Sequence, residues 1–438
     1  MSIHPGIFIP VAAILLVFSN QANTQQAISL EEAISAATAA NTSIALAETD
    51  EQIAASRYRQ SRAVFLPEVS LSWSALTSNN PLNAFGFKLQ QRSVGAEDFN
   101  PAQLNEPGAT ADFITKLEIR QPIVNMDMVY QRKAAGKQVE VYRRIAKRTK
   151  EQIRFEVQKV YLQLQLAYQA RSVLQESLRT AEAFARISND YFEQGLMQKS
   201  DLLNARLQVT GITTKITELD NNIATASDYL DLLMNRATGQ LYVVEPLAGN
   251  KSLVDTTAEF SQRADIEAMR KMIEAADLMA RSARNSLLPR LNAFANYQFN
   301  NNAMFGYDAN AYLAGIQLSW DIFRGNRTRH QIAEQGLNKK KLEQQLRQQL
   351  DQSAVQLSQV KRELANASYK MKQYEAAVQQ AEEALRITQN RFQQGLIKSA
   401  DVLAAQTQVS QQKLAYTEAL YQYQLAVYQI EFLTTSDK

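Results

Sequence analysis

The sequence predicts a mainly α-helical chain with a small β part, built as two tandem structural repeats. Three observations predict this class: a segment that recurs 200 positions later, two long runs without glycine or proline, and short stretches of alternating apolar and polar residues. The recurring segments are 181–209 and 381–409, and they share Phe192 with Phe392 and Gly195 with Gly395. A fixed internal period of this size indicates a duplicated unit, with both halves built alike.

Composition excludes several classes of function. The chain contains no cysteine, which rules out disulfides, zinc–thiolate sites, cysteine nucleophiles and lipid attachment at cysteine. Of its two histidines, His4 lies in the predicted leader, and His330 alone forms neither a ligand set nor a base. The formal net charge is +3 with no basic block, which argues against nucleic acid as a partner. No nucleophile–base set, metal-ligand cluster or glycine-rich phosphate loop is present, so we expect no enzyme, no metal and no cofactor.

The N-terminus predicts export. The apolar run Gly6–Phe18 has the length of a signal-peptide core and precedes two plausible cleavage positions, Ala22 and Ala27. Its first residues lack lysine and arginine, so the alternative is a membrane-anchoring first helix. We divide the chain into a signal peptide at 1–27, repeat 1 at 28–236, an irregular linker at 237–261 and repeat 2 at 262–438.

Each repeat is predicted to begin with a helix that ends at a leucine–proline pair. The first helix opens near Ser29, where Glu32 completes a capping box, and ends before residues 65–67. The second runs from about Ala264 to residues 287–289. Proline stops both helices because it disfavours helical geometry in the residue before it.

Four strands follow, at 69–74, 113–120, 290–299 and 312–321, and each alternates one apolar with one polar face. This pattern matches transmembrane β-barrel segments, but a soluble antiparallel sheet with one buried face has the same period. Aromatic residues near strand ends, such as Trp73 and Trp320, favour the membrane interpretation. A long connection at 78–112 joins the first two strands, and a short one at 300–310 joins the last two.

A very long helix comes next in each repeat. Neither glycine nor proline interrupts the residues between Gly136 and Gly195 or between Gly336 and Gly395. About 60 helical residues extend roughly 90 Å. Their apolar positions keep the 3-4 spacing of coiled coils, broken only at Arg171, although an ordinary helical bundle would also satisfy it.

Both long helices end at a repeated Gln-Gly-Leu, where glycine lets the chain turn. A second helix then runs over about 200–236 and about 400–433. Each repeat therefore contains an antiparallel helical hairpin with its tip at Gly195 or Gly395.

This order of elements resembles the TolC family of outer-membrane efflux proteins over essentially the whole mature chain. The most specific match is the signature Phe-Gln-Gln-Gly-Leu, Asp-Val-Leu and Ala-Gln within Phe392–Gln406, with its copy at Phe192–Arg206. The Leu-Pro pairs and Gln121-Pro122-Ile123 support it. The resemblance implies a homotrimer whose chains each give four transmembrane strands to a shared 12-stranded barrel and their helices to a long periplasmic α-barrel tunnel.

The implied function is the outer-membrane channel of a tripartite efflux or type I secretion system, a passive conduit without catalytic role. Its partners would be a periplasmic adaptor protein, an inner-membrane transporter that supplies energy, and outer-membrane lipid. The alternative is a periplasmic coiled-coil adaptor or stalk protein. Such a protein would carry a lipoyl-like β-domain between its hairpin helices, where this chain has only a glycine turn.

The resemblance also assigns site residues. Gly195, Leu196, Gly395 and Leu396 match the hairpin tips that meet the adaptor, although a tight turn alone would also explain the glycines. An exposed leucine at a turn is harder to explain without a partner.

Asp201 and Asp401 match carboxylates that narrow the periplasmic entrance as a gate ring, while the helix dipole alone also favours aspartate there. Family members with an Arg–Asp latch carry it where this chain has Ile397 and Ala404, so Lys199 and Lys398 are the candidate replacements.

Overall fold

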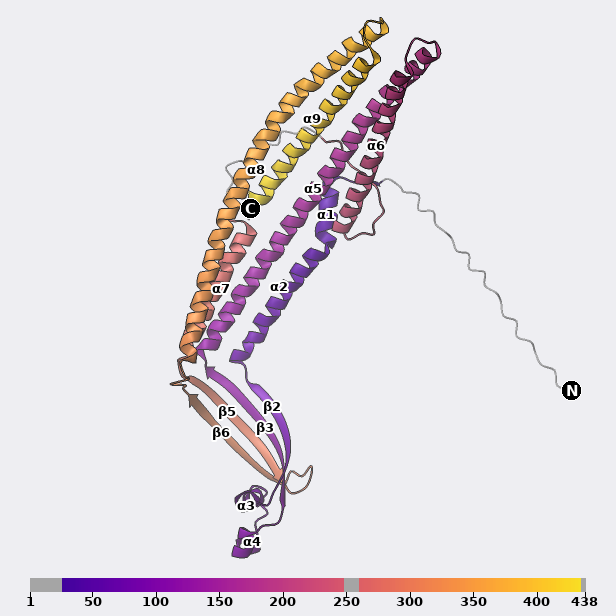
Figure 1. Ribbon diagram of the computed structural model, residues 1–438. Helices are drawn as coiled ribbons and strands as arrows, with labels where there is room; N and C mark the ends of the chain where they lie inside the picture. Colours follow the sequence, from indigo (N-terminus) through magenta and orange to yellow (C-terminus); the bar gives the residue numbers. More distant parts are fainter. Residues whose placement is uncertain (1–25, 248–259, 435–438) are drawn as a thin grey trace, which may run out of the picture. The chain divides into compact units, whose positions relative to one another are not determined.

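The computed structural model describes residues 26–247 and 260–434, so most of the predicted signal peptide and part of the predicted linker lie outside the described residues. The chain divides into two compact units. The sheet unit comprises residues 42–152, 255–360 and 430–438, and the hairpin unit comprises residues 1–41, 153–254 and 361–429. Each unit is described by itself, with elements labelled as in Figure 1.

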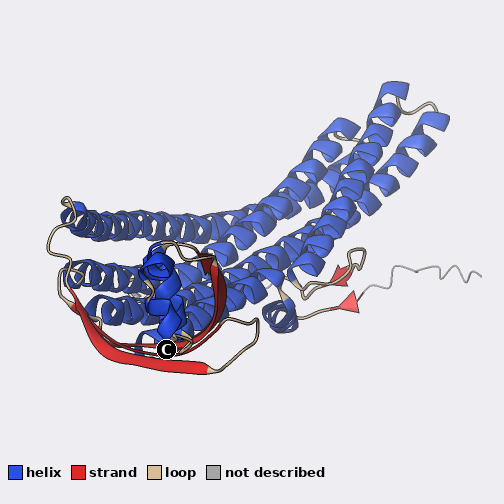
Figure 2. Ribbon diagram, turned by 90° about the horizontal axis from the view of Figure 1, so that it is seen from below, coloured by secondary structure: helices blue, strands red, loops and turns tan. Residues whose placement is uncertain are grey.

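The sheet unit holds the four predicted strands. They are β2 (Glu68–Ser78), β3 (Thr110–Val124), β5 (Arg290–Asn301) and β6 (Ala309–Ser319), all antiparallel, in the order β2-β3-β5-β6. Figure 2 shows the sheet as a strongly curved band. Every strand extends beyond its predicted residues at one end or both. β6 nevertheless ends at Ser319, before Trp320, which was predicted within this strand. The indole N–H of Trp320 donates to Leu287 O at 2.9 Å.

The strand register collects the apolar residues on one face. Leu71 lies opposite Leu117, Leu117 opposite Tyr297, and Tyr297 opposite Tyr312. Because side chains alternate along a strand, the neighbours two positions away share this face. The opposite face carries mostly polar residues at matching positions, in the rows Ser70, Glu118, Asn296 and Leu313, and Ser72, Lys116, Gln298 and Ala311.

Aromatic rings gather near one end of the sheet. Trp73 stacks on Phe113 and on Phe305 with ring centroids 6.1 and 6.2 Å apart, and Phe299 makes an edge contact with Tyr307. Phe305 and Tyr307 lie in the connection between β5 and β6 and add to the aromatic residues that the sequence analysis noted near the strand ends.

The connection between β2 and β3 is more ordered than the sequence analysis predicted. It contains α3 (Pro81–Gln90), a 3₁₀ turn η2 (Ala96–Phe99) and α4 (Pro101–Asn105). Asn80 and Asn100 each cap a helix through the side-chain oxygen, and proline occupies the first helical position both times. The repeated Asn-Pro pair could have predicted the start of both helices, because asparagine favours the N-cap and proline favours the next position.

Four helices complete the sheet unit. Two belong to it whole, α2 (Thr42–Gln60) and α7 (Ala264–Asn285), and two belong to it with their first parts, α5 (Met126–Glu193) and α8 (Arg327–Gln393). The 3₁₀ turn η1 (Ser61–Phe65) precedes β2. The predicted end of each first helix before its Leu-Pro pair is confirmed. Both long helices begin well before Gly136 and Gly336, which lie inside them.

The hairpin unit contains α1 (Leu30–Ala40), the later parts of α5 and α8, and their return helices α6 (Lys199–Leu233) and α9 (Ser399–Thr434), the last to residue 429. Ser29 and Glu32 form the predicted capping box. The first predicted helix is nevertheless broken at Asn41, whose backbone is extended and whose amide donates to Leu233 O at 2.8 Å. That buried hydrogen bond to the end of α6 explains the break.

A short strand ties the start of the described chain to the predicted linker. Strand β1 (Gln26–Ala27) pairs in parallel with β4 (Tyr242–Val243). The hydroxyl of the buried Tyr242 donates to Asp231 Oδ1 at 2.6 Å. A signal-peptide cut after Ala27 would remove β1, whereas a cut near Ala22 would keep it.

The predicted coiled-coil positions are packed unequally in the two hairpins. In α5, Val157, Val160 and Leu164 are almost completely buried, and the interrupting Arg171 pairs with Asp220 of α6 at 2.7 Å. In α8 the corresponding stripe is covered in part. Its half-buried members are Leu364, Met371, Tyr374 and Leu385, and its buried members are Leu357, Val360, Ala367 and Ala381. The second hairpin therefore presents a less covered apolar seam within one chain.

Within residues 26–247 and 260–434, no helix combines the length and the hydrophobicity that a membrane-spanning helix requires.

The two tip glycines adopt backbone conformations that other residues resist. Gly195 and Gly395 both have φ of +73°, and an added Cβ would meet nothing within 4 Å, so only backbone strain opposes substitution. Gly211 lies inside α6 and is equally uncrowded, which makes it a matched control.

We therefore predict opposite effects of Gly→Ala changes on thermal unfolding. Gly195→Ala and Gly395→Ala should each destabilise by about 1 kcal/mol, since an L-residue at positive φ is strained. Gly211→Ala should stabilise by about 1 kcal/mol, because alanine is the better helix former. Circular-dichroism melting of the three variants measures this, and a shift of the same sign at the tips and at Gly211 would contradict the assignment.

Candidate functional site

The hairpin tips are built twice in the same way. At the end of α5, Gly195 N donates to Phe192 O at 3.0 Å and Leu196 N to Tyr191 O at 2.8 Å. The second tip repeats these bonds from Gly395 and Leu396 at 2.9 and 3.0 Å. Hydrogen bonds of this kind satisfy the last carbonyls of a helix when glycine takes the left-handed conformation.

The tip leucines gain almost no burial from the fold. Leu196 is 72% exposed and Leu396 is 63% exposed. Burying such a side chain fully is worth roughly 1.5–3 kcal/mol, and the isolated chain leaves most of that unused. The tips thus present two apolar side chains, one per hairpin, which a partner protein could cover.

The two gate candidates occupy the third position of their helices. Asp401 Oδ2 accepts a hydrogen bond from Lys398 N at 3.2 Å, so this carboxylate caps α9. Asp201 stands at the same position of α6, but its carboxylate accepts no such bond. Both lie near positive helix ends, which favour a negative charge. Among the described residues, neither Lys199 nor Lys398 forms an ion pair with them.

An apolar cluster joins the two hairpins close to their tips. Phe184, Ala205 and Val402 are buried, and Phe392, Ile397 and Leu403 pack against them. The ring of Phe392 lies 5.5 Å from that of Phe184 and 6.3 Å from that of Tyr191, between centroids. Ile397, which stands where an arginine latch was sought, therefore takes part in an apolar contact between the hairpins.

Polar bonds continue this connection along the hairpins. Buried Gln406 donates its amide to Ser177 O at 3.2 Å, and the hydroxyls of Ser177 and Ser410 lie 2.6 Å apart. Lys413 bridges Glu176 of α5 and Glu382 of α8 at 3.2 and 2.9 Å. Burial acts to lower the pKa of Lys413, but the hydrogen bonds to the two glutamates outweigh it and raise the pKa above its usual value, so the ammonium stays charged at neutral pH.

The sequence analysis missed this contact between hairpins, although part of its signal was visible. Phe392 belongs to the repeated signature, but periodicity along one helix does not show which other helix a ring will meet. Across the described residues, no group of three or more histidine, aspartate or glutamate side chains is placed to hold a metal ion.

Comparison with known proteins identifies the architecture. A sequence model of the family described as "Outer membrane efflux protein" matches residues 33–236 and 259–435, which together make up most of the chain. The chain belongs to the outer membrane efflux protein family. The two matched segments carry one copy each of the helix, strand and hairpin order described above. No curated protein matches the sequence at a significant level.

Solved structures of outer-membrane channels share the fold of this efflux protein. CusC aligns with a TM-score of 0.79 at 15% identity, covering 99% of both chains. VceC from Vibrio cholerae aligns with a TM-score of 0.77 at 19% identity, covering 93% of this chain and 96% of its own. The CmeC outer membrane channel of Campylobacter jejuni aligns with a TM-score of 0.78 at 17% identity, covering 98% and 94%.

Several predictions from the sequence are thereby confirmed. The fold is mainly helical with long helices and a small antiparallel sheet in two repeats, and the protein is an outer-membrane efflux channel with a periplasmic helical extension. It is a transport protein and not an enzyme. The alternative of a periplasmic adaptor or stalk is set aside, because the family match covers both repeats.

We predict that the second hairpin depends on Phe392 more than the first depends on its counterpart. Phe392→Ala should remove the ring contacts to Phe184 and Tyr191 and loosen that tip by about 1–2 kcal/mol, less than a fully buried phenylalanine would cost. Phe192→Ala changes the equivalent residue of repeat 1, which is 37% exposed and should cost little. Hydrogen exchange of the tip peptides measures both, and equal effects would rule out the apolar contact between hairpins.

Proposed function

We propose that three copies of the chain form the working channel, each contributing its sheet to one barrel and its hairpins to one conduit. The observation that carries this proposal is the open sheet: β2 and β6 are both edge strands, and an apolar face runs across all four strands. An exposed edge strand carries backbone N–H and C=O groups without hydrogen-bond partners, and lipid cannot supply these partners. A sheet of this kind in a membrane must therefore be closed by other copies.

The number of copies follows from the width that a conduit needs. Two copies would supply eight strands, and an eight-stranded barrel has an interior that side chains fill. Three copies would supply 12 strands and a wider lumen. Exposed apolar residues along α8, among them Leu337, Val355 and Tyr369, support a further contact between neighbouring copies.

The tips provide the proposed contact with a periplasmic adaptor protein. Leu196 and Leu396, each beside its turn glycine Gly195 or Gly395, would insert into apolar surface of that adaptor. An inner-membrane transporter would supply the energy, and the trimer would act as the passive outer-membrane conduit of a tripartite efflux or type I secretion system. The exposure of both leucines supports this contact.

Asp201 and Asp401 are the proposed periplasmic gate. In a trimer they would place six carboxylates near one axis, where mutual repulsion opposes closure and favours bound cations. Asp401 also caps its helix, so it would combine a structural and an electrostatic role.

Strand pairing between copies can be tested by cysteine cross-linking, because the natural chain has no cysteine. Ser72→Cys on β2, combined in turn with cysteine replacements at 311, 313, 315 and 317 on β6, should give a disulfide ladder ending at the trimer. One register should dominate, since a paired strand fixes its partner's position. Ser72→Cys alone is the control and should not cross-link. Cross-linked products no larger than a dimer, or no cross-linked product with any of the four cysteine pairs, would contradict the proposed assembly.

The adaptor contact predicts loss of transport without loss of assembly. The pair Leu196→Asp and Leu396→Asp should abolish efflux in cells lacking their own channel, because a charge replaces the apolar contact. The trimer should persist, since exposed tips contribute little to folding. The matched pair Leu196→Met and Leu396→Met should retain efflux. Normal efflux by the correctly expressed aspartate pair would leave the leucines without a role in partner binding.

The gate assignment predicts cation selectivity that depends on charge and not on helix capping. Asp201→Asn and Asp401→Asn together keep a capping oxygen but remove the carboxylate charge. Their reconstituted channels should lose cation selectivity and bind periplasmic divalent cations more weakly, since charged clefts concentrate counter-ions about tenfold or more. Planar-bilayer recordings measure the ion selectivity and the block by divalent cations. If neither changes, the two aspartates stabilise only the starts of their helices and do not form a gate.

A further inference from the structure

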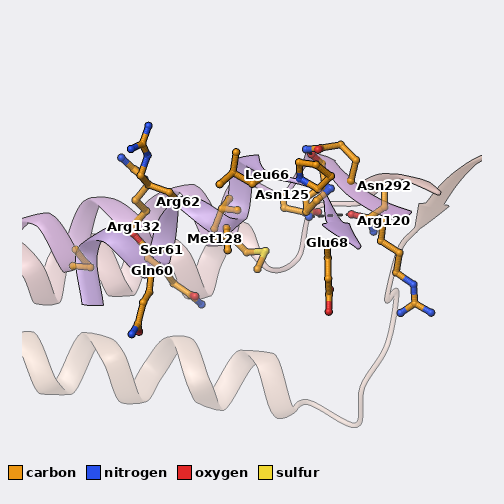
Figure 3. A pocket seen from close by; sticks show the side chains of 18 of the residues that line it. Gln60, Ser61, Arg62, Leu66, Glu68, Arg120, Asn125, Met128, Arg132 and Asn292 are labelled. Carbon is orange, nitrogen blue, oxygen red and sulfur yellow. Dashed lines mark hydrogen bonds between the residues drawn. The ribbon is translucent and has the colours of Figure 1, made fainter. Parts of the chain in front are cut away.

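A large cavity in the sheet unit lies against the polar face of the sheet. Its volume is about 2280 Å³, and it is lined by strand residues and by the adjoining ends of α2, α5 and α7. Figure 3 shows Glu68, Arg120 and Asn292 on the strands with Arg62 and Arg132 on the helical side. Glu68, Arg120 and Asn296 belong to the face opposite the apolar one. Glu68 pairs with Arg120 three positions from the Leu71 row, and Asn296 pairs with Glu118 one position from it, so odd separations place all three on the other face.

The cavity carries an excess of positive charge. Its charged lining residues are four arginines and two glutamates, Arg59, Arg62, Arg120, Arg132, Glu68 and Glu118. That leaves two net positive charges per chain. Glu118 is moreover engaged twice, by Lys116 at 2.9 Å and by Arg120. Arg59 and Arg62 form no ion pair within the described chain, and both are exposed toward solvent.

Two polar atoms in the wall of the cavity are buried without a hydrogen-bond partner among the described residues. One terminal nitrogen of Arg132 is buried without a hydrogen-bond partner, while its guanidinium lies over the rings of Tyr58 and Phe65 at 4.8 and 5.5 Å. Asn125 is only 7% exposed and donates to Asn292 Oδ1 at 3.1 Å, yet its own oxygen has no partner. Both atoms are packed within the wall, so the groups that a bound anion can reach are the exposed guanidinium groups of Arg59 and Arg62.

Part of the remaining lining is apolar, and the rest carries uncharged polar side chains. Met128, Met272, Met279 and Phe294 contribute side chains to the wall beside the arginines. Methionine adapts its shape to irregular ligands, and phenylalanine offers a flat apolar surface. A ligand that fits this wall therefore combines an apolar body with negative charge.

We propose that this cavity is a binding site for organic anions with an apolar body, which makes the sheet end of the conduit anion-selective. The inference rests on the proposed trimer, because only there does the polar face line a shared lumen. Three copies would carry six net positive charges around it. The guanidinium groups of Arg59 and Arg62 bind the acidic groups of the ligand, since arginine recognises carboxylates and sulfonates by paired hydrogen bonds.

The conduit would then carry opposite charges at two places, with the proposed aspartate gate at the tips and this basic belt in the sheet unit. The gate would repel an anion that the belt attracts, so the charge of the blocker separates the two sites in an experiment.

The test uses naphthalene trisulfonate, an aromatic trianion, added to the extracellular side of reconstituted channels in planar bilayers. It should block the natural channel, and Arg59→Gln with Arg62→Gln should weaken the block by about tenfold, the lower range for focusing by a charged cleft. Both arginines are exposed, so the fold should tolerate the change. Arg57→Gln is the matched control, because Arg57 is exposed on the same helix but does not line the cavity.

Three other outcomes are distinguishable. Equal block in the natural channel and the Arg59→Gln, Arg62→Gln variant would overturn the basic belt while leaving the channel intact. Equal weakening by Arg57→Gln would also overturn it, since general surface charge would then explain the block. Absence of any conducting trimer would contradict the proposed function and, with it, the shared lumen on which the inference depends.

Discussion

The open edges of a four-stranded sheet are the constraint on which the rest of this protein depends. β2 and β6 each leave one row of backbone N–H and C=O groups without a partner strand among the described residues. Water could satisfy those groups, but hydrocarbon cannot. A chain with an apolar face across all four strands and two such edges is incomplete as a membrane structure. Self-association is therefore a condition of its placement in the outer membrane.

The same incompleteness recurs in the helices. In the first hairpin, most coiled-coil positions of α5 are buried within one chain. In α8, buried positions such as Val360 alternate with half-buried ones such as Met371 and Tyr374. A duplicated sequence has thus produced two hairpins with different surroundings. The contacts between the hairpins, from the Phe184–Phe392 rings to the Lys413 bridges, hold their tips together. Leu196 and Leu396 take no part in these contacts, and both remain exposed.

Much of this could be predicted from the sequence because local patterns dominate it. Strand alternation and the Gln-Gly-Leu turns depend on residues close together in the chain, and both were found within a few residues of their predictions. The long helices were predicted as well, although they begin well before Gly136 and Gly336. The break at Asn41 could not be predicted, since its cause is a hydrogen bond to Leu233, 192 positions away. The same holds for β1, which pairs with the predicted linker at Tyr242.

The candidate site could be predicted only in part, because some of its contacts join residues that are distant in the sequence. The tip motif is local and repeated, so both turns were located, whereas Ile397 looked like a missing latch until its packing partners were known. The basic cavity gathers Arg59, Arg120 and Arg132 from three elements whose proximity no spacing rule indicates. The helices after β2 were different: their Asn-Pro starts were local signals that the sequence analysis did not use.

Hydrogen exchange at the sheet edges tests the central claim most directly. The measurement compares the amides of edge strands β2 and β6 with those of inner strands β3 and β5, in protein reconstituted into lipid. If neighbouring copies close the sheet, the edge amides should exchange as slowly as the inner ones, because paired amides exchange only when the structure opens. Fast exchange along β2 and β6, with β3 and β5 protected, would show an open four-stranded sheet and contradict the account.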